Sequence, residues 1–387
     1  MRNKKTYEEI NEKIKKGEAV VLTAEEVTVM AKEMTVAEIA REVDVVTTAT
    51  FGPMCSSGAF INFGHSEPPI RMEKITLNDV AVFSGLAAVD AYIGATEVSP
   101  YDEKYGGAHI IEELIAGKDV LLKAWGKGTD CYPRQQIETH INKDTVNEIF
   151  MFNPRNSYQN YGAACNSSKK IKFTYMGVLL PNLGNITYST SGELSPLIND
   201  PELRTIGIGT KIFLCGAEGY VIWNGTQFNT GVQKNNFGIP YKGGATLSVI
   251  GDLKKMSENF IKAVYYENYG VSLFVGIGIP IPILDEDMAN FVTISNNKIH
   301  TTIFDYGLYD KPEIAKVTYA ELKTGKIKLF NKEVRTAPLS SLKKAREIAE
   351  TLKNWILSGD FTLTKPVSAL PDNIKINKLK SDEEILE

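Results

Sequence analysis

Several features that identify common classes of protein are scarce or absent in this chain of 387 residues. Only four cysteines are present and none forms a C-x-x-C pair, so a disulfide scaffold is excluded. No apolar run reaches the roughly 18 residues of a membrane span, because glycines and prolines interrupt the longest stretch, 271–284. The first 16 residues are charged and lack the apolar centre of a signal peptide. These absences predict a cytoplasmic protein with reduced thiols and no membrane partner.

An excess of charge of one sign is also missing. The chain has 43 Lys plus Arg against 47 Asp plus Glu, a formal net charge of -4. Because nucleic-acid binding requires a basic face, we expect no nucleic-acid partner. Hydrophobic residues make up 43% of the chain, and a protein of this size buries about 75% of its surface on folding. The composition therefore predicts a globular protein whose core needs neither a disulfide nor a metal.

Motifs for the common cofactors and metals are missing as well. Two Gly-x-Gly pairs, at 207–209 and 276–278, follow expected strands but lack the third glycine of a dinucleotide site. The chain has no P-loop, no H-E-x-x-H motif and no G-x-S-x-G nucleophile turn. The histidines have no metal-ligand spacing: His65, His109, His140 and His300. We therefore expect no metal site and no tightly bound cofactor, while Schiff-base chemistry on a lysine, which has no local signature, stays open.

The residue pattern predicts a mixed α/β (α+β) fold. Capping boxes of the form T-x-x-E begin three expected helices near the N-terminus, at 6–9, 23–26 and 35–38. Residues 43–51 are rich in β-branched side chains and predict a strand, which Gly52-Pro53 should end. Further strands are expected, mostly in a glycine-rich middle region, at 120–125, 171–180, 204–214, 220–223, 245–250 and 271–279.

Turns, later helices and domain limits can also be placed. Asn224-Gly225 is typical of a hairpin turn. Amphipathic patterns predict helices near 109–116 and at 341–357. We expect one domain over 1–365, with two lobes that split near 160 and meet where the loops of Cys55 and Cys131 converge. Residues 366–387 should form a surface extension, with neither a CBS nor a ferredoxin domain.

Two of the four cysteines lie in loops that follow expected strands, where open α/β sheets bind ligands. Cys55 lies in 52–59 (GPMCSSGA), whose small residues allow a ligand or an anion to approach the backbone. A cysteine packed under a tight loop explains this segment equally well.

Cys131 lies in 126–134 (GKGTDCYPR) and has Lys127 and Arg134 within four residues. Adjacent cations favour a thiolate and should also stabilise a persulfide anion, whereas Asp130 opposes this effect. A purely structural loop is the alternative.

The other candidate groups are weaker. Cys165 lies in a small-residue segment and could be a third loop thiol, whereas Cys215 ends an apolar strand and is expected in the core. His65 shares a polar loop with the Cys55 region and is the best candidate acid or base, although it could simply order the loop. Arg71 could bind a substrate carboxylate or form an exposed ion pair. The loops at 105–109 and 189–196 could line the same cleft or be ordinary turns.

The segments around both cysteines resemble the homocysteine biosynthesis family. The similar segments are long and specific and extend from the first helix to about residue 365. They are 47–59 (TTATFGPMCSSGA), 62–72 (NFGHSEPPIRM), 128–134 (GTDCYPR), 191–197 (SGELSPL) and 276–282 (GIGIPIP).

This resemblance implies an L-aspartate semialdehyde sulfurtransferase, which makes homocysteine from aspartate semialdehyde and sulfide-derived sulfur, as in anaerobes and notably methanogenic archaea. The two motif cysteines of the family match Cys55 and Cys131, and one of them is expected to carry a persulfide. The resemblance also implies a small ferredoxin-like iron–sulfur protein as a partner for sulfur and electrons. Whether the chain forms a homo-oligomer stays open.

One mechanism agrees with both the residues and the resemblance. Cys131 receives sulfur as a persulfide that Lys127 and Arg134 stabilise, and the sulfur attacks the aldehyde carbon of the substrate. Cys55 then cleaves the sulfur–sulfur bond, and an external two-electron donor reduces the resulting disulfide. His65 or His109 could supply the proton for the carbonyl oxygen, and Arg71 or Arg134 could bind the substrate carboxylate.

Two alternatives come from other classes of protein. The chain could be a non-catalytic sulfur carrier or an iron–sulfur scaffold, with three of the three to four thiolates that clusters generally need: Cys55, Cys131 and Cys165. It could also be a structural subunit of a sulfur-assimilation complex.

Overall fold

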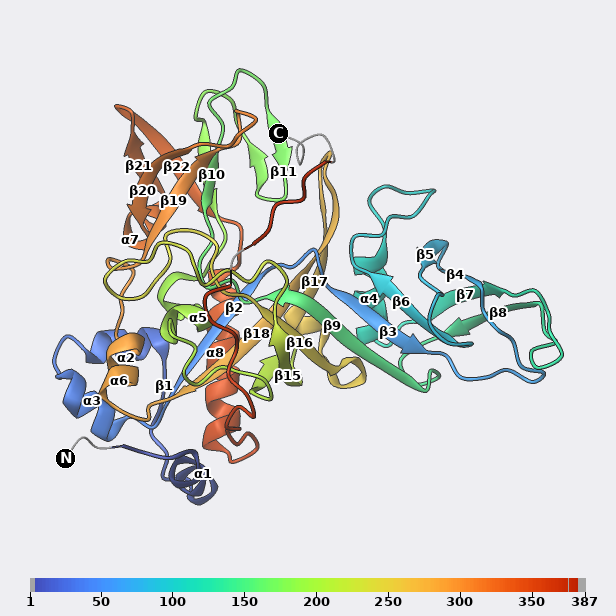
Figure 1. The fold of residues 1–387 in the computed structure, drawn as a ribbon, viewed down its shortest axis with the longest axis horizontal. Coiled ribbons are helices and arrows are strands. Elements are labelled where there is room, and N and C mark those ends of the chain that lie inside the picture. The colour runs from blue at the N-terminus through green and yellow to red at the C-terminus, as the bar shows by residue number, and fades with distance from the viewer. Residues whose placement is uncertain (1–3, 375, 382–387) are drawn as a thin grey trace.

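The computed structural model describes residues 4–374 and 376–381. Figure 1 shows a broad body with an arm that extends from one side of it. The body contains two large sheets and most of the helices, and the arm contains a smaller sheet. The mixed α/β class predicted from the sequence is therefore confirmed.

The N-terminal helices begin at the three predicted threonines. They are α1 (Tyr7–Lys16), α2 (Ala24–Met30) and α3 (Val36–Glu42). In each case the threonine hydroxyl accepts the N–H of the glutamate three residues on, and that glutamate accepts the threonine N–H. Each pair satisfies backbone donors that the first helical turn would otherwise leave unbonded.

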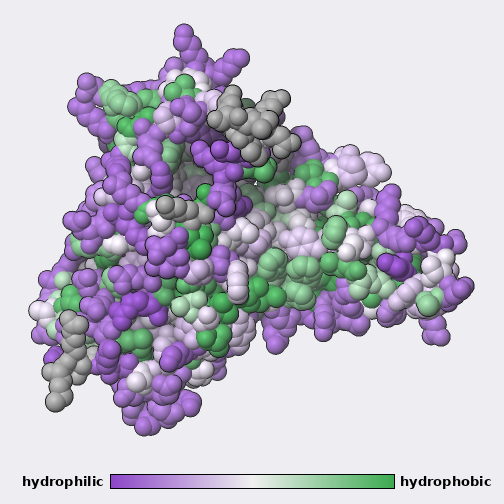
Figure 2. Space-filling model, in the orientation of Figure 1, coloured by the Kyte–Doolittle hydropathy of each residue, from purple (hydrophilic) through white to green (hydrophobic). Residues whose placement is uncertain are grey.

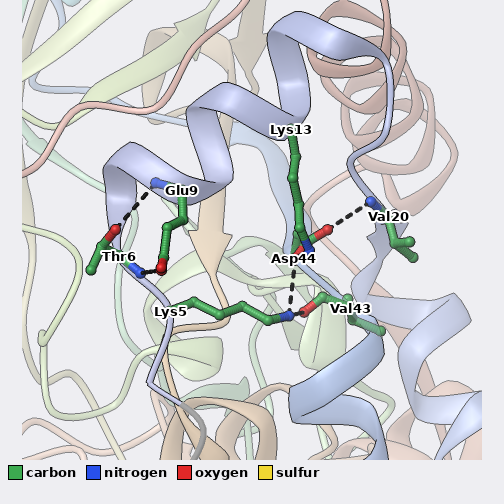
Figure 3. A network of polar contacts seen from close by, with 7 residues as sticks. All are labelled: Lys5, Thr6, Glu9, Lys13, Val20, Val43 and Asp44. Carbon is green, nitrogen blue, oxygen red and sulfur yellow. Dashed lines mark hydrogen bonds and ion pairs between the residues drawn. The ribbon is translucent and has the colours of Figure 1, made fainter.

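A buried carboxylate joins this helical region to the main sheet. The side chain of Asp44 is fully buried, and Figure 3 shows it between two lysines. It lies 3.0 Å from Lys5 Nζ and 2.7 Å from Lys13 Nζ, and it accepts the N–H of Val20 at 3.0 Å. Burial by itself would raise the pKa of Asp44, but these hydrogen bonds and positive charges outweigh it and lower the pKa below its ordinary value.

The largest sheet has ten strands and is mostly antiparallel, with β1 parallel to β2. Its order is β1-β2-β18-β14-β15-β16-β9-β3-β6, and β17 pairs with β18. In that order the strands are β1 (Val21–Thr23), β2 (Val45–Pro53), β18 (Gly270–Pro282), β14 (Lys211–Leu214), β15 (Ala217–Asn224), β16 (Leu247–Asp252), β9 (Glu148–Asn156), β3 (Gly58–Asn62), β6 (Asp90–Gly94) and β17 (Ile261–Tyr266).

Near the β1 edge of this sheet, the pair β2 and β18 is covered by helix α8 (Leu342–Leu357). A Cβ atom added to Gly276 would lie 2.8 Å from the Ile348 side chain, and one added to Gly278 would lie 3.1 Å from it. The Gly-x-Gly pair at 276–278 therefore lets α8 approach the sheet. This packing accounts for both glycines without a dinucleotide.

The second sheet has six strands in the order β20-β19-β10-β13-β22-β21. They are β20 (Glu313–Thr318), β19 (His300–Asp305), β10 (Ala163–Cys165), β13 (Asn185–Tyr188), β22 (Lys332–Pro338) and β21 (Lys326–Leu329). Beside it lies a hairpin formed by β11 (Lys172–Thr174) and β12 (Gly177–Leu179). The short helices of the body are α5 (Pro196–Asn199), α6 (Glu286–Val292) and α7 (Tyr319–Lys323).

The arm contains a four-stranded sheet, β5-β4-β7-β8, and helix α4. The elements are β4 (Lys74–Leu77), β5 (Val80–Val82), α4 (Gly107–Ile115), β7 (Val120–Trp125) and β8 (Gln136–Ile141). The β7–β8 loop lies at the far end of the arm from the body (Figure 1).

Several predicted elements were wrong in extent. The strand expected at 171–180 is the β11–β12 hairpin, and β2 continues through Gly52 to Pro53. Residues 204–210 are not part of the strand predicted at 204–214, because the Asp200 carboxylate accepts the backbone N–H groups of residues 204–206 and holds them in a loop. From residue 366 the chain packs against the body through the bridge between Ile208 and Ser368. The rest of the predicted extension includes residues 375 and 382–387, which lie outside the described residues.

The predicted hairpin turn at Asn224-Gly225 was also wrong. Asn224 ends β15, but a long segment follows before β16 begins at Leu247. The tight hairpin lies at Cys215-Gly216, where φ is 50° and 88° and Leu214 pairs with Ala217. Glycine accommodates the second of these angles without steric cost.

The visible face is mostly hydrophilic, with hydrophobic residues concentrated where the body joins the arm (Figure 2). Within the described part of the chain, no helix is both long and apolar enough to cross a membrane.

Candidate active site

A cavity of about 250 Å³ lies between the two large sheets. Its walls come from the end of β2 and the following turn, the end of β9, the loop at 189–196, and the tips of the β11–β12 and β17–β18 hairpins. The predicted role of the 189–196 loop as a lining segment is confirmed. The loop at 105–109 contributes no lining residue.

Cys55 is half-buried in the wall of this cavity, in the turn between β2 and β3. Its Sγ lies 3.2 Å from the hydroxyl oxygen of Ser272, a fully buried residue of β18. The turn itself is closed by the N–H and the hydroxyl of Ser57, which both donate to the carbonyl of Met54. The thiol therefore has a defined position and access to the cavity.

Polar contacts to β9 fix this turn further. The amide of Asn153 donates to Ser57 Oγ at 2.9 Å. The Ser56 hydroxyl lies 3.2 Å from both Asn153 Oδ1 and the carbonyl oxygen of Arg155. Because Asn153 is fully buried, the positions of Cys55 and Arg155 are coupled through a rigid contact.

Tyrosines form much of the cavity wall around Cys55. Burial raises the pKa of Tyr269 to about 12, and the charge of Cys55 and a hydrogen bond with it act in the same direction. Burial followed by the charge of Cys55 also raises the pKa of Tyr266, and burial raises that of Tyr158. Tyr158 and Tyr269, which line the cavity, therefore keep their protons near neutral pH and can donate hydrogen bonds to an oxygen that gains charge.

Two of the lining tyrosines belong to a hydrogen-bonded series. The Tyr161 hydroxyl donates to Tyr175 Oη at 3.4 Å, and the Tyr175 and Tyr306 hydroxyls are 2.6 Å apart. The rings of Tyr175 and Tyr269 meet edge to face with centroids 6.2 Å apart. The tips of the two hairpins therefore contact each other at the cavity.

Arg155 is the cation of this cavity, since its described lining residues include no lysine, histidine, aspartate or glutamate. Its Nε atom is buried and has no hydrogen-bond partner among the described residues. An anionic ligand would satisfy both the charge and the donor.

Cys131 lies elsewhere, in the β7–β8 loop at the far end of the arm, and it is exposed. No residue of its loop lines the Cys55 cavity. The expectation that the two cysteine loops converge in one chain was therefore wrong. They lie apart because Cys55 lies in the turn that joins β2 and β3 of the ten-stranded sheet, whereas Cys131 lies between β7 and β8 of the arm sheet.

The structure gathers the other predicted site residues around the Cys131 loop. Arg134 donates through Nε to the carbonyl of Pro68 at 3.0 Å and through Nη2 to that of Glu67. The ring of His65 stacks on that of Tyr132, with centroids 6.1 Å apart. These contacts hold the segment around residues 64–71 against the loop.

Lys127 and Arg71 lie on the same part of the arm. The Lys127 side chain is 80% exposed and its Nζ lies 3.9 Å from Glu73. Arg71 is exposed, and its backbone lies against Gly126, where an added Cβ would be 2.2 Å from the Arg71 carbonyl oxygen. Their predicted binding roles stay predictions, because neither residue lines the Cys55 cavity.

His109 has a structural role at the start of α4. Its Nδ1 accepts the N–H of Gly106 at 3.2 Å at the start of α4, and its ring stacks on Tyr105. Burial lowers the pKa of His109, which favours the neutral ring that this hydrogen bond needs.

The remaining cysteines are buried. Cys165 is part of β10 rather than of a loop, and burial raises the pKa of its thiol to about 12. Cys215 is fully buried, as predicted, and burial raises the pKa of its thiol to about 12 as well. Cys55 and Cys131 lie in loops of two different sheets and Cys165 lies in a strand of a third, so a shared iron–sulfur cluster has no geometric support within one chain. No group of three metal-binding side chains occurs among the residues that the structure describes.

Sequence reasoning missed Arg155 and the tyrosines of the cavity. The available signal was the polar run at 153–158 (NPRNSY) that directly follows a short apolar segment, 149–152 (IFMF), which could have been identified as a strand. Tyr175 and Tyr269 had no comparable signal, because each occupies the tip of a hairpin far away in the sequence.

Comparison with known proteins gives a consistent set of relatives. A protein of Methanosarcina acetivorans is 49% identical over 384 residues, covering 98% of this chain and 75% of the relative. One of Methanocaldococcus jannaschii is 52% identical over 384 residues, covering 95% and 73%. Both are named L-aspartate semialdehyde sulfurtransferase. An uncharacterised protein of Methanothermobacter thermautotrophicus is 28% identical over 331 residues. No solved structure matches the chain.

The model of one protein family covers most of the chain. It is described as homocysteine biosynthesis enzyme, sulfur-incorporation, and it matches residues 19–363. This match contains the Cys55 cavity and the Cys131 loop together. The chain belongs to the homocysteine biosynthesis enzyme family.

Proposed function

We propose that this chain is an L-aspartate semialdehyde sulfurtransferase that forms L-homocysteine. The observation that carries the proposal is the position of Cys55, a thiol in a tyrosine-lined cavity with Arg155 as its cation. A cavity of this kind suits a small aldehyde that also carries an anionic group. The two relatives that share about half of their residues with this chain have this activity in their names.

The overall reaction determines which reactants, electrons and protons must reach the active site. One aldehyde, one hydrogen sulfide, two electrons and two protons give one thiol and one water. The outer sulfur of a Cys55 persulfide adds to the aldehyde carbon, and the carbonyl oxygen takes up a proton as it gains charge. Two electrons then cleave the sulfur–sulfur bond and free the Cys55 thiol, water leaves, and two further electrons reduce the carbon–sulfur double bond to the thiol. Because conversion of sulfide to the persulfide gives up two electrons, the net demand is two electrons. Tyr269 and Tyr158, protonated at neutral pH, are the proton or hydrogen-bond donors available in the cavity.

Cys131 is the proposed entry point for sulfur. It is exposed, and its loop carries Lys127 and Arg134, whose positive charges stabilise a persulfide anion. Sulfide forms this persulfide by displacing a thiolate from Cys131 held in a disulfide, so a two-electron acceptor, proposed to be the same ferredoxin-type partner, first oxidises Cys131. Exchange of sulfur with Cys55 then requires the arm of this chain, or of a second copy in a homo-oligomer, to close on the cavity.

The electrons are proposed to come from a separate protein of the ferredoxin type. A pair of thiols can supply two electrons only by forming a disulfide, which must be reduced before the next turnover. A separate donor must therefore supply the two electrons that each turnover consumes. A cytoplasmic location, where thiols stay reduced, fits this chemistry and is part of the proposal.

Anaerobic turnover tests the proposed function. Protein incubated with L-aspartate semialdehyde, sulfide and titanium(III) citrate should form one homocysteine for each aldehyde consumed, as measured by mass spectrometry. Exposure to sulfide after mild oxidation should add the mass of one sulfur atom, which peptide mapping should locate at Cys131 or Cys55. Absence of homocysteine, together with absence of added sulfur at both cysteines, would contradict the proposal.

The role of a cavity tyrosine can be tested separately. Replacing Tyr269 with phenylalanine should lower the turnover number about a hundredfold, because the ring contact with Tyr175 remains while the proton donor is lost. The melting temperature should change little. Tyr309→Phe is the matched control, because the Tyr309 side chain is fully exposed and lies outside the cavity. Equal turnover in both variants would assign the proton to another group.

A further inference from the structure

Arg155 combines a positive charge with an unsatisfied donor in the wall of the Cys55 cavity. The residue is half-buried, but its Nε atom is buried and no described residue accepts a hydrogen bond from it. Buried polar atoms in folded proteins are almost always paired, so a charged donor in a cavity wall that no protein atom pairs is suited to bind a ligand.

The neighbours of Arg155 do not neutralise it. The lining residues described for the cavity include no carboxylate, and the nearby phenol of Tyr158 stays neutral because burial raises its pKa. Asn153 Oδ1 already accepts the backbone N–H of Arg155 at 3.0 Å and contacts the Ser56 hydroxyl at 3.2 Å. A guanidinium without a counter-charge and partly removed from water is unfavourable unless an anion binds to it.

A second unpaired polar atom lies two residues further along the chain. The Ser157 hydroxyl is buried without a partner among the described residues, and Ser157 lines the same cavity. Its φ of 51° is unfavourable for a residue with a side chain, and the Asn156 side chain stabilises it by accepting the Ser157 N–H at 2.6 Å. The backbone therefore maintains a strained conformation that presents Arg155 and Ser157 to one space.

This anion site is adjacent to the reactive thiol. Ser56, the residue after Cys55, contacts the carbonyl oxygen of Arg155 at 3.2 Å. The charges of Cys55 and Arg155 both act on the hydroxyls of Tyr158 and Tyr269, with opposite effects on their pKa values. An anion on Arg155 would thus lie within the same small cavity as the sulfur of Cys55.

We propose that Arg155, assisted by the Ser157 hydroxyl, binds the carboxylate of the substrate and so restricts the cavity to aldehydes that carry a carboxylate. The inference rests on the proposed function. The planar guanidinium suits a two-point contact with a carboxylate, which also orients the aldehyde toward Cys55. Arg71 and Arg134, the arginines expected from the sequence to bind the carboxylate, are held on the arm, outside this cavity.

Alkylation of Cys55 tests the anion site without turnover. Iodoacetate carries a carboxylate and iodoacetamide does not. The quantity measured is the rate of Cys55 alkylation by iodoacetate divided by the rate with iodoacetamide. This ratio should be higher in the wild type than in Arg155→Gln. The ratio of the two rates should fall about tenfold in that variant and less in Arg155→Lys, which keeps the charge but loses the planar fork. Cys131 in the same molecules is the internal reference, and its ratio should not change. An unchanged ratio at Cys55 in correctly folded Arg155→Gln would overturn the inference.

Kinetics separate this inference from the proposed function. Arg155→Gln should raise the KM for aspartate semialdehyde about tenfold to a hundredfold. It should also lose most of the preference for this substrate over 3-aminopropanal, the same aldehyde without the carboxylate. Arg134→Gln, on the arm, should keep the wild-type preference if Arg155 is the anchor. If Arg155→Gln forms homocysteine and still fully prefers aspartate semialdehyde over 3-aminopropanal, Arg155 does not anchor the carboxylate, but the proposed function stands. A wild-type protein that forms no homocysteine, yet shows the Arg155-dependent alkylation ratio, would refute the proposed function and support the anion site.

Discussion

Replacing Cys55 with serine is expected to reduce homocysteine formation to background, a loss on the order of a thousandfold or more. A hydroxyl is a much poorer nucleophile than a thiolate and cannot carry a persulfide. The fold should be preserved, because serine can keep the contact with Ser272 and the turn is held by Ser56 and Ser57. The measurement is anaerobic homocysteine production, with thermal unfolding followed by circular dichroism.

A matched control uses a cysteine outside the cavity. Cys165 is fully buried in β10 and packs in the core of the second sheet. Cys165→Ala should therefore cost about 1 kcal/mol of unfolding free energy, as removal of a small buried group does, and leave turnover near the wild-type rate. If Cys55→Ser retained activity while its melting temperature stayed normal, the sulfur chemistry would have to occur away from the cavity.

The second large effect should be on stability. Asp44→Asn is expected to lower the free energy of unfolding by about 3 kcal/mol at neutral pH, because it leaves two lysines without the carboxylate that pairs them. Most of this loss of stability comes from Lys5, because its side chain is only 14% exposed and little water can replace the lost carboxylate. Chemical denaturation at pH 7 measures this difference. The control is Asp79→Asn, which breaks a more exposed pair with Lys123 and should cost less than about 1 kcal/mol.

The ion pairs of Asp44 also predict how the free energy of unfolding depends on pH. The pKa of Asp44 is lower in the folded protein than its ordinary value of 3.8, so folding favours the ionised form. The stabilisation is fully present above the unfolded-state pKa and is lost as the pH falls from that value through the folded-state pKa. The difference between wild type and Asp44→Asn should therefore stay constant down to about pH 5 and shrink below about pH 4. A difference that grew on acidification would contradict this assignment.

Local sequence patterns predicted local structure well. The three threonine capping boxes began helices at the predicted residues, and Ser341 begins α8 as its amphipathic pattern indicated. These signals succeed because the interacting groups are only three or four residues apart. Asn224-Gly225 failed as a hairpin turn, because pairing of β15 with β16 across a long connection outweighs the preference of two residues.

The sequence by itself determined the family, the burial of Cys215, and the choice of Cys55 and Cys131 as the cysteines in polar loops. Only the tertiary structure decided which groups surround each of them. Cys55 meets Ser272 across 217 residues of sequence, and Arg155 and the tyrosines reach the cavity from β9 and from two hairpin tips. Such contacts depend on strand pairing over long separations, for which adjacent residues carry no signal. For the same reason Cys131, attached to the arm sheet, lies apart from the cavity that we expected its loop to share.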